Sequence, residues 1–226
     1  MNSDHQQALV LDFGGVISRT LFETHPDTEA ALGLAPGTLT WRGPFDPESD
    51  PLWQSMQRDE ISERDYWCQR TAEVGQLVGQ QWTQMHEFVR AGRGSDPDRV
   101  IRPEALIALN IARRSGYKLA ILSNELDLFY GREFRDRLPF MQWFDVITDA
   151  TYTEILKPDP RAYVLCLQSL HVQPEQCVFV DDQFRNIKGA RNVGMQTVHF
   201  SFMEPEPGYR QALELLGLDY DADQQY

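Results

Sequence analysis

The chain has 226 residues, a formal net charge of −13 and a hydrophobic fraction of 42%, which is typical of a folded globular protein. No apolar run approaches the roughly 20 residues that cross a bilayer, and the polar stretch MNSDHQQ does not resemble a secretory signal. We therefore expect a cytoplasmic protein without a membrane partner. Its acidity also argues against nucleic acid, because an acidic surface repels a phosphate backbone.

The first predicted strand covers residues 8–12 and ends in Asp12, which Phe13, Gly14 and Gly15 follow. A carboxylate at the end of an apolar strand is a candidate functional group. Glycines after it allow a ligand to approach the backbone closely and leave amides available for oxyanions.

Residues 20–98 differ in composition from the rest of the chain, with four tryptophans, many charges and helix signals. Ser62 and Asp65 stand at capping-box spacing, which predicts a helix start. The stretch AGRGSDPD at residues 91–98 predicts a flexible return linker. We interpret residues 20–98 as a mostly helical insertion in which the tryptophans pack a small core.

The second half alternates between strands and helices. Strands are predicted at residues 118–124, 144–150, 177–182 and 196–200, and helices at residues 102–116, 159–172, 184–194 and 208–217. Asp159 is predicted to cap its helix, with Pro160 in the first turn. This alternation predicts an α/β fold with a parallel sheet that is covered on both faces.

Ligands of open α/β sheets bind beyond the carboxyl ends of the strands. The polar residues expected there are Asp12, Ser123, Asn124, Asp149, Asp181 and Asp182, with Lys157 in a nearby loop. Three close carboxylates repel one another unless a cation shares the site, and Mg²⁺ is the usual choice where phosphate binds. Asp149 is more simply a cap of the following segment.

Four stretches stand in order along the chain: VLDFGGV at Asp12, ILSN at Ser123, LKP at Lys157, and VFVDD at Asp181 and Asp182. With them the chain resembles hydrolases of the haloacid dehalogenase superfamily that carry a helical cap after the first strand. The resemblance implies a Rossmann-like core of residues 1–19 and 99–226. It implies a cap domain of residues 20–98.

The resemblance also implies a function, a Mg²⁺-dependent phosphatase of a small phosphorylated metabolite that forms an aspartyl-phosphate on Asp12. The implied catalytic residues are Asp12, Ser123 and Lys157, and the implied metal ligands are Asp12, the Gly14 carbonyl, Asp182 and Asp181, with Asn186 in support. The expected substrate-binding residues are Gly14, Gly15, Ser123, Asn124, Lys157, Arg19 and Thr20. Arg42 is a further candidate for a second anionic group of the substrate.

Gly14 departs from the pattern, because phosphatases of this superfamily usually carry a second aspartate there as general acid and base. Such help is worth roughly 10²–10⁴-fold in rate. Its loss favours acyl phosphates, aryl phosphates or sugar 1-phosphates, unless a cap residue or a bound water replaces the acid.

Two alternatives stay open. A dehalogenase-type hydrolase would use Asp12 on carbon, and KPDPRAY, with Lys157 and Tyr163, looks like the dehalogenase form of this loop, although Tyr163 is more simply a core residue. The acidic pair at residues 181–182 argues instead for a metal. A non-catalytic module that binds a phosphorylated metabolite is the second alternative, and Gly14 is its main support.

The cysteines Cys68, Cys166 and Cys177 form no C-x-x-C pair, and Cys166 and Cys177 are predicted to be buried. The histidines show no zinc-ligand spacing. The sequence leaves open whether the protein is a monomer or a homodimer.

Overall fold

The computed structural model describes residues 7–93 and 97–222. Contacts divide the chain into two compact units. The core unit consists of the described residues of Met1–Arg19, Ile101–Leu126 and Leu138–Tyr226. The helical unit consists of the described residues of Thr20–Val100 together with Asp127–Arg137.

The strands are β1 (Ala8–Leu11), β2 (Lys118–Ser123), β3 (Val146–Asp149), β4 (Cys177–Asp181) and β5 (Gln196–His199). The helices are α1 (His25–Leu32), α2 (Pro51–Gln57), α3 (Glu63–Leu77), α4 (Met85–Arg93), α5 (Pro103–Arg114), α6 (Leu126–Tyr130), α7 (Arg132–Asp136), α8 (Ala150–Thr153), α9 (Pro160–Leu170), α10 (Phe184–Asn192) and α11 (Pro205–Leu215).

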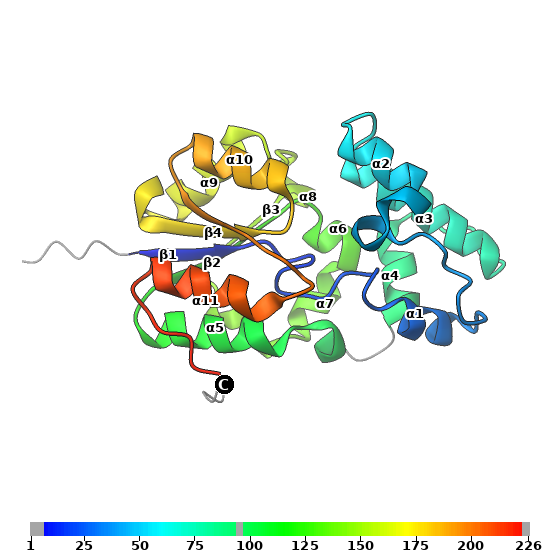
Figure 1. The fold of residues 1–226 in the computed structure, drawn as a ribbon, viewed down its shortest axis with the longest axis horizontal. Coiled ribbons are helices and arrows are strands. Elements are labelled where there is room, and N and C mark those ends of the chain that lie inside the picture. The colour runs from blue at the N-terminus through cyan, green and yellow to red at the C-terminus, as the bar shows by residue number, and fades with distance from the viewer. Residues whose placement is uncertain (1–6, 94–96, 223–226) are drawn as a thin grey trace, which may run out of the picture. The chain divides into compact units, whose positions relative to one another are not determined.

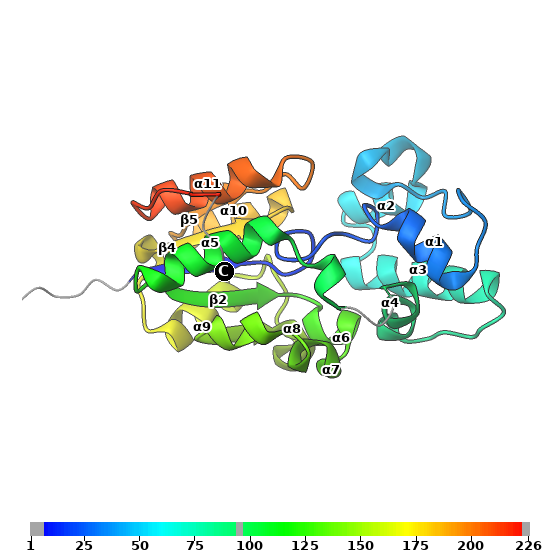
Figure 2. The same ribbon diagram turned by 90° about the horizontal axis from the view of Figure 1, so that it is seen from below.

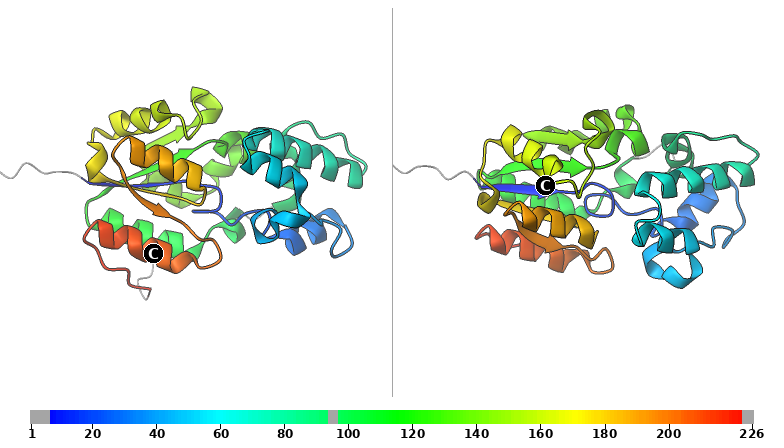
Figure 3. Two further views of the ribbon diagram at one scale, coloured as in Figure 1. Left: turned by 45° about the horizontal axis from the view of Figure 1, so that its top comes forward. Right: turned by 90° about the horizontal axis from the view of Figure 1, so that it is seen from above.

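The core unit is built on a parallel five-stranded sheet with the order β3-β2-β1-β4-β5. Helices α9 and α10 pack on one face of the sheet, and α5 and α11 pack on the other (Figure 1). Figure 2 shows α5 lying along β2, and Figure 3 shows the same layers from two further sides. The predicted α/β fold with a covered parallel sheet is confirmed.

The central strand is apolar along its whole length because both of its faces are covered. All four residues of β1 are buried, and β4 is buried throughout. Cys166 and Cys177 lie in the apolar cluster between α9 and the sheet, as predicted, while Cys68 is exposed. Burial raises the pKa of the Cys166 thiol to about 11, so this side chain behaves as a packing residue.

The helical unit packs around aromatic side chains. Phe22 contacts the rings of Trp41 and Trp67 at centroid distances of 5.5 and 5.4 Å. The ring centroid of Phe129, from the second segment of this unit, lies 5.2 Å from that of Trp67. This contact helps to explain why residues 127–137 belong to the helical unit, whereas the predicted insertion covered only residues 20–98. That this unit acts as a cap stays a prediction.

Several local predictions can be compared with the structure directly. Ser62 and Asp65 form the predicted capping box at the start of α3, and the Asp159 side chain accepts a hydrogen bond at the start of α9. The predicted linker at residues 91–98 is wrong in its first part, because α4 continues to Arg93; residues 94–96 lie outside the described residues. Within the described ranges, no helix is long and apolar enough to span a bilayer.

Candidate functional site

The carboxyl ends of three neighbouring strands bring polar residues together in the core unit. Leu11 of β1 is paired with Val180 of β4, so Asp12 follows at the level where β4 ends in Asp181. The Asp12 N–H donates to the Val180 carbonyl at 2.9 Å, which continues the ladder up to this residue. Ser123 is the last residue of β2, on the other side of β1.

Asp12, Asp181 and Asp182 form a cluster in which one carboxylate oxygen of each lies within 4.8 Å of the others. Asp12 and Asp181 are buried, and Asp182 is half-buried. Three carboxylates this close repel one another, and a shared cation removes that repulsion. A set of oxygen donors alone fits a hard divalent cation such as Mg²⁺ better than a soft one.

Lys157 supplies a positive charge to this cluster. Its Nζ lies 2.9 Å from Asp12 Oδ1 and 2.7 Å from Asp181 Oδ2, and the residue is only 3% exposed. Burial alone would lower the pKa of Lys157, but the two carboxylates outweigh it and raise the pKa above its ordinary value. The ammonium is therefore charged at neutral pH and holds Asp12 and Asp181 together.

The two adjacent aspartates have different surroundings. Asp181 is fully buried; its Oδ1 accepts from the Gln183 N–H at 2.8 Å, and both of its oxygens accept from the Asn186 side-chain amide at 3.1 Å. Asp181 therefore accepts hydrogen bonds from Lys157, Gln183 and Asn186. Asp182 is the more accessible carboxylate, which favours it as the direct metal ligand.

Asn124 has a role that the motif did not indicate. Its side-chain Nδ2 donates to the Lys157 carbonyl at 3.1 Å, and its Oδ1 accepts from the Lys157 N–H at 2.7 Å. This amide therefore fixes the backbone of Lys157 on both sides. The neighbouring Ser123 is buried, and its hydroxyl accepts a long contact of 3.4 Å from the Glu125 N–H.

The loop after Asp12 is compact. The Phe13 N–H donates to Asp12 Oδ1 at 2.7 Å, and Gly15 has a φ of 81°, which favours glycine. Gly14 is different, since its φ is not left-handed and a Cβ added to it would meet no atom of the described residues within 4 Å, apart from those of its two chain neighbours. The backbone would accept a side chain at this position, so the missing carboxylate is not a steric requirement.

The remaining candidates are Arg19, Thr20 and Arg42, and each is described within its own unit. Arg19 is exposed, and Thr20, in the helical unit, donates from its N–H and its hydroxyl to the Glu23 carboxylate at 2.7 and 2.9 Å. Arg42 is exposed beside a cavity of about 300 Å³ in the helical unit, which buried His25 also lines.

Asp149 and Tyr163 have the structural roles that the sequence analysis preferred for them. The Asp149 side chain accepts from the Thr151 N–H at 2.9 Å and caps α8. Tyr163 is fully buried in the core, where its hydroxyl donates to the Asn186 carbonyl at 2.8 Å.

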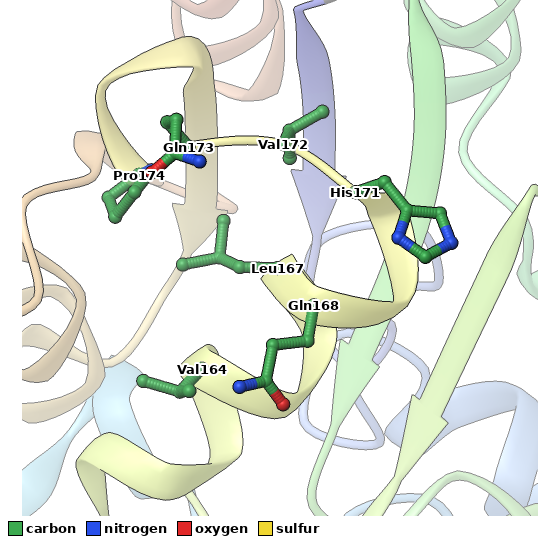
Figure 4. A pocket seen from close by; sticks show the side chains of 7 residues that line it. All are labelled: Val164, Leu167, Gln168, His171, Val172, Gln173 and Pro174. Carbon is green, nitrogen blue, oxygen red and sulfur yellow. The ribbon is translucent and has the colours of Figure 1, made fainter.

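An open depression of about 490 Å³ lies elsewhere on the core unit, lined by α9 and by the turn that leads into β4 (Figure 4). The lining residues are Val164, Leu167, Gln168, His171, Val172, Gln173 and Pro174. This turn precedes β4, so the depression lies toward the amino end of that strand, away from the carboxylates. Its walls hold no carboxylate, and it lacks the charge density of the cluster around Asp12.

A parallel α/β core with a carboxylate cluster and a lysine at the carboxyl ends of its strands defines a class of hydrolases. Residues 7–194 match the family of haloacid dehalogenase-like hydrolases, and the chain belongs to this family.

Among curated proteins, the chain is 36% identical over 111 residues to acyl-CoA dehydrogenase family member 10 of Mus musculus (49% of this chain, 10% of the relative). It is 35% identical over 94 residues to phosphatase MT3486 of Mycobacterium tuberculosis (42% of this chain, 43% of the relative). The chain thus spans less than half the length of these two relatives. It is 23% identical over 202 residues to phosphoglycolate phosphatase of Psychrobacter arcticus, with 87% of this chain and 84% of that protein covered.

Solved structures show the same fold. L-2-haloacid dehalogenase from Xanthobacter autotrophicus matches with a TM-score of 0.56 at 20% identity, covering 86% of this chain and 77% of that one. A haloacid dehalogenase family enzyme from Bacteroides thetaiotaomicron, solved as a mutant in complex with magnesium and inorganic phosphate, matches with a TM-score of 0.54 at 16% identity, covering 88% and 96%.

Proposed function

We propose that the protein is a Mg²⁺-dependent phosphatase of a small phosphorylated metabolite and that Asp12 is its nucleophile. The observation that carries this proposal is the cluster of three carboxylates within 4.8 Å, two of which form ion pairs with Lys157. The phosphatases among the relatives, and the magnesium and phosphate bound by a protein of the same fold, support it.

In this proposal an Asp12 carboxylate oxygen attacks phosphorus, and the bond from phosphorus to the ester oxygen breaks. The leaving group takes the electron pair, and the phosphoryl group is held on Asp12. Water then attacks phosphorus, breaks its bond to the Asp12 oxygen and releases inorganic phosphate. Lys157 stays charged throughout and stabilises the anionic oxygens around Asp12.

Asp12, Asp182, Asp181 and the Gly14 carbonyl would hold the cation, which when bound neutralises the charge of the phosphoryl group. The Ser123 hydroxyl, at the end of the neighbouring strand, would donate to a phosphoryl oxygen. The loop amides after Asp12 would bind the same group.

Gly14 sets the substrate class, because no carboxylate is present at the position where a leaving group would usually receive its proton. An alkoxide needs that proton, whereas a phenolate, with a pKa of about 10 for its phenol, leaves far more readily. We therefore propose an acyl phosphate, an aryl phosphate or a sugar 1-phosphate as the substrate. The cytoplasmic location and the state as monomer or homodimer remain predictions of the sequence.

The test is product release by the wild type and by Asp12→Asn, with and without Mg²⁺, from acetyl phosphate, an aryl phosphate, sugar phosphates and 2-chloropropionate. The proposal expects Mg²⁺-dependent phosphate release that disappears in Asp12→Asn. Asp149→Asn is the matched control. Asp149 also ends a strand, the edge strand β3, but its side chain caps α8, so the Asp149→Asn variant should retain activity. Metal-independent chloride release would establish the dehalogenase alternative instead, and ligand binding without turnover would favour a binding module.

A further inference from the structure

The loop of residues 12–18, which we call the nucleophile loop, is held through its carbonyl oxygens by two side chains that are distant from it in the sequence. Arg102, directly before α5, donates from Nε to the Gly15 carbonyl at 3.2 Å. Tyr209, on α11, donates from its hydroxyl to the Val16 carbonyl at 2.5 Å. These donors lie 87 and 193 residues away in sequence, so no motif around Asp12 indicates them.

Arg102 contacts the nucleophile loop twice. Besides its bond to Gly15, its main-chain N–H donates to the Ile17 carbonyl at 3.0 Å. Only 3% of the residue is exposed, and its guanidinium lies 5.8 Å from the centre of the Phe200 ring. Burying a guanidinium is costly unless its donors are used; the Nε donor of Arg102 is used on this loop, and the main-chain N–H of the same residue ties the loop a second time.

The contacts fix the peptide planes on both sides of Gly14. The Phe13 carbonyl accepts from the Ser18 N–H at 2.9 Å, and the Gly15 carbonyl accepts from Arg102. Because peptide units are planar, fixing these two planes restricts the plane between them, which carries the Gly14 carbonyl. No residue in the described part of the chain donates a hydrogen bond to that carbonyl.

We propose that Arg102 is a positioning residue, which together with Tyr209 orders the nucleophile loop and keeps the Gly14 carbonyl available to a cation bound at Asp12. The cation part of this inference rests on the proposed function. The ordering of the loop does not, since it concerns the protein without ligand.

The test compares Arg102→Met, Arg102→Lys and Tyr209→Phe with the wild type. Arg102→Lys keeps the charge but loses the Nε donor, and Tyr209→Phe removes only a hydroxyl, so both variants serve if Arg102→Met does not fold. Arg114→Met is the matched control, because Arg114 is an exposed arginine at the other end of the same helix. The readouts are hydrogen exchange of the loop amides without Mg²⁺, calorimetric binding of Mg²⁺ alone, and kcat and KM for acetyl phosphate.

The proposal expects faster exchange of the amides of residues 13–18 in the Arg102 variants, with the amides of β2 unchanged. It expects Mg²⁺ affinity to fall about 10- to 100-fold, as is typical when groups behind a metal ligand are removed. It expects kcat to fall while KM changes less than about twofold.

The proposal would be overturned if folded Arg102 variants had the same loop exchange rates and the same Mg²⁺ affinity as the wild type. It would also be overturned if the variants lost global stability while loop exchange and Mg²⁺ affinity stayed unchanged. If the wild type releases no phosphate but the variants show faster loop exchange and weaker Mg²⁺ binding, the proposed function fails and the positioning role stands. If the wild type binds no Mg²⁺, the cation part is overturned.

Discussion

Lys157→Met removes the positive charge on which the carboxylate cluster depends. The Lys157 Nζ lies within 3 Å of both Asp12 and Asp181, and the side chains of Lys157, Asp12 and Asp181 are 2%, 11% and 0% exposed. Methionine is similar in length but leaves both carboxylates without their ammonium. Removing one partner of a buried ion pair costs about 3–5 kcal/mol, because the remaining charge stays buried. We expect a loss of this size in the free energy of unfolding when no metal is present.

The sign of the pH dependence follows from the pKa of Lys157. Asp12 and Asp181 outweigh burial and raise this pKa above its ordinary value of 10.5. The contribution of Lys157 to stability is therefore complete below that value and is lost only at higher pH. The deficit of Lys157→Met should therefore be the same at pH 5, 7 and 9 and should begin to shrink only above about pH 10.5.

Urea unfolding of the wild type and Lys157→Met at pH 5, 7, 9 and 11, with and without Mg²⁺, measures the size of the deficit and its pH dependence. Mg²⁺ should recover part of the loss, since it neutralises the same carboxylates. Lys188→Met is the control, because Lys188 is exposed and contacts Phe184 instead. A deficit below about 1 kcal/mol between pH 5 and 9 would refute the stabilising role of Lys157 in the carboxylate cluster.

Three further predictions concern single positions. Gly14→Asp should raise kcat on alkyl phosphates by more than it does on aryl phosphates, with a ceiling of roughly 10²–10⁴-fold; equal gains on both would contradict the missing-acid argument. Asp182→Asn should weaken Mg²⁺ binding, measured by calorimetry, while its stability without metal stays near that of the wild type. Asp181→Asn should weaken Mg²⁺ binding and also lower that stability; equal stability losses in the two variants would contradict the different roles given to the two aspartates. Burial and the charge of Arg42 lower the pKa of His25 from 6.5 to about 4, so wild-type stability should fall by about 3 kcal/mol between those values as the pH drops; a parallel pH profile in His25→Gln would speak against this.

The sheet and its edge residues could be predicted because their signals are local. Each strand is a short apolar run, and Asp12, Ser123 and Asp181 stand where those runs end. Since parallel strands place their carboxyl ends at one edge, the position along the strand was enough to group these residues. The capping box of Ser62 and Asp65 was equally local, because four consecutive residues contain all of it.

Contacts between distant residues were not predictable in this way. Asn124 follows Ser123 in a strand-end motif, which indicated a substrate contact, yet both polar atoms of its side chain bind the backbone of Lys157. Arg102 gave no signal, because an arginine before a helix is common and its partner Gly15 lies 87 residues earlier. Such pairings arise from the tertiary fold, and only the packed structure shows them.

The pair of aspartates shows where a motif stops being informative. In sequence, Asp181 and Asp182 are equivalent negative charges. In the fold, Asp181 ends β4 with no exposed surface and with donors from Lys157 and Asn186, so its charge is compensated within the protein. Asp182 adds a second negative charge within 4.8 Å of the first, at a half-buried position that solvent ions can reach. The first charge can therefore stabilise the fold without a metal, whereas the second is best accommodated when a cation is bound, and this asymmetry is the physical reason to expect an ion at this edge of the sheet.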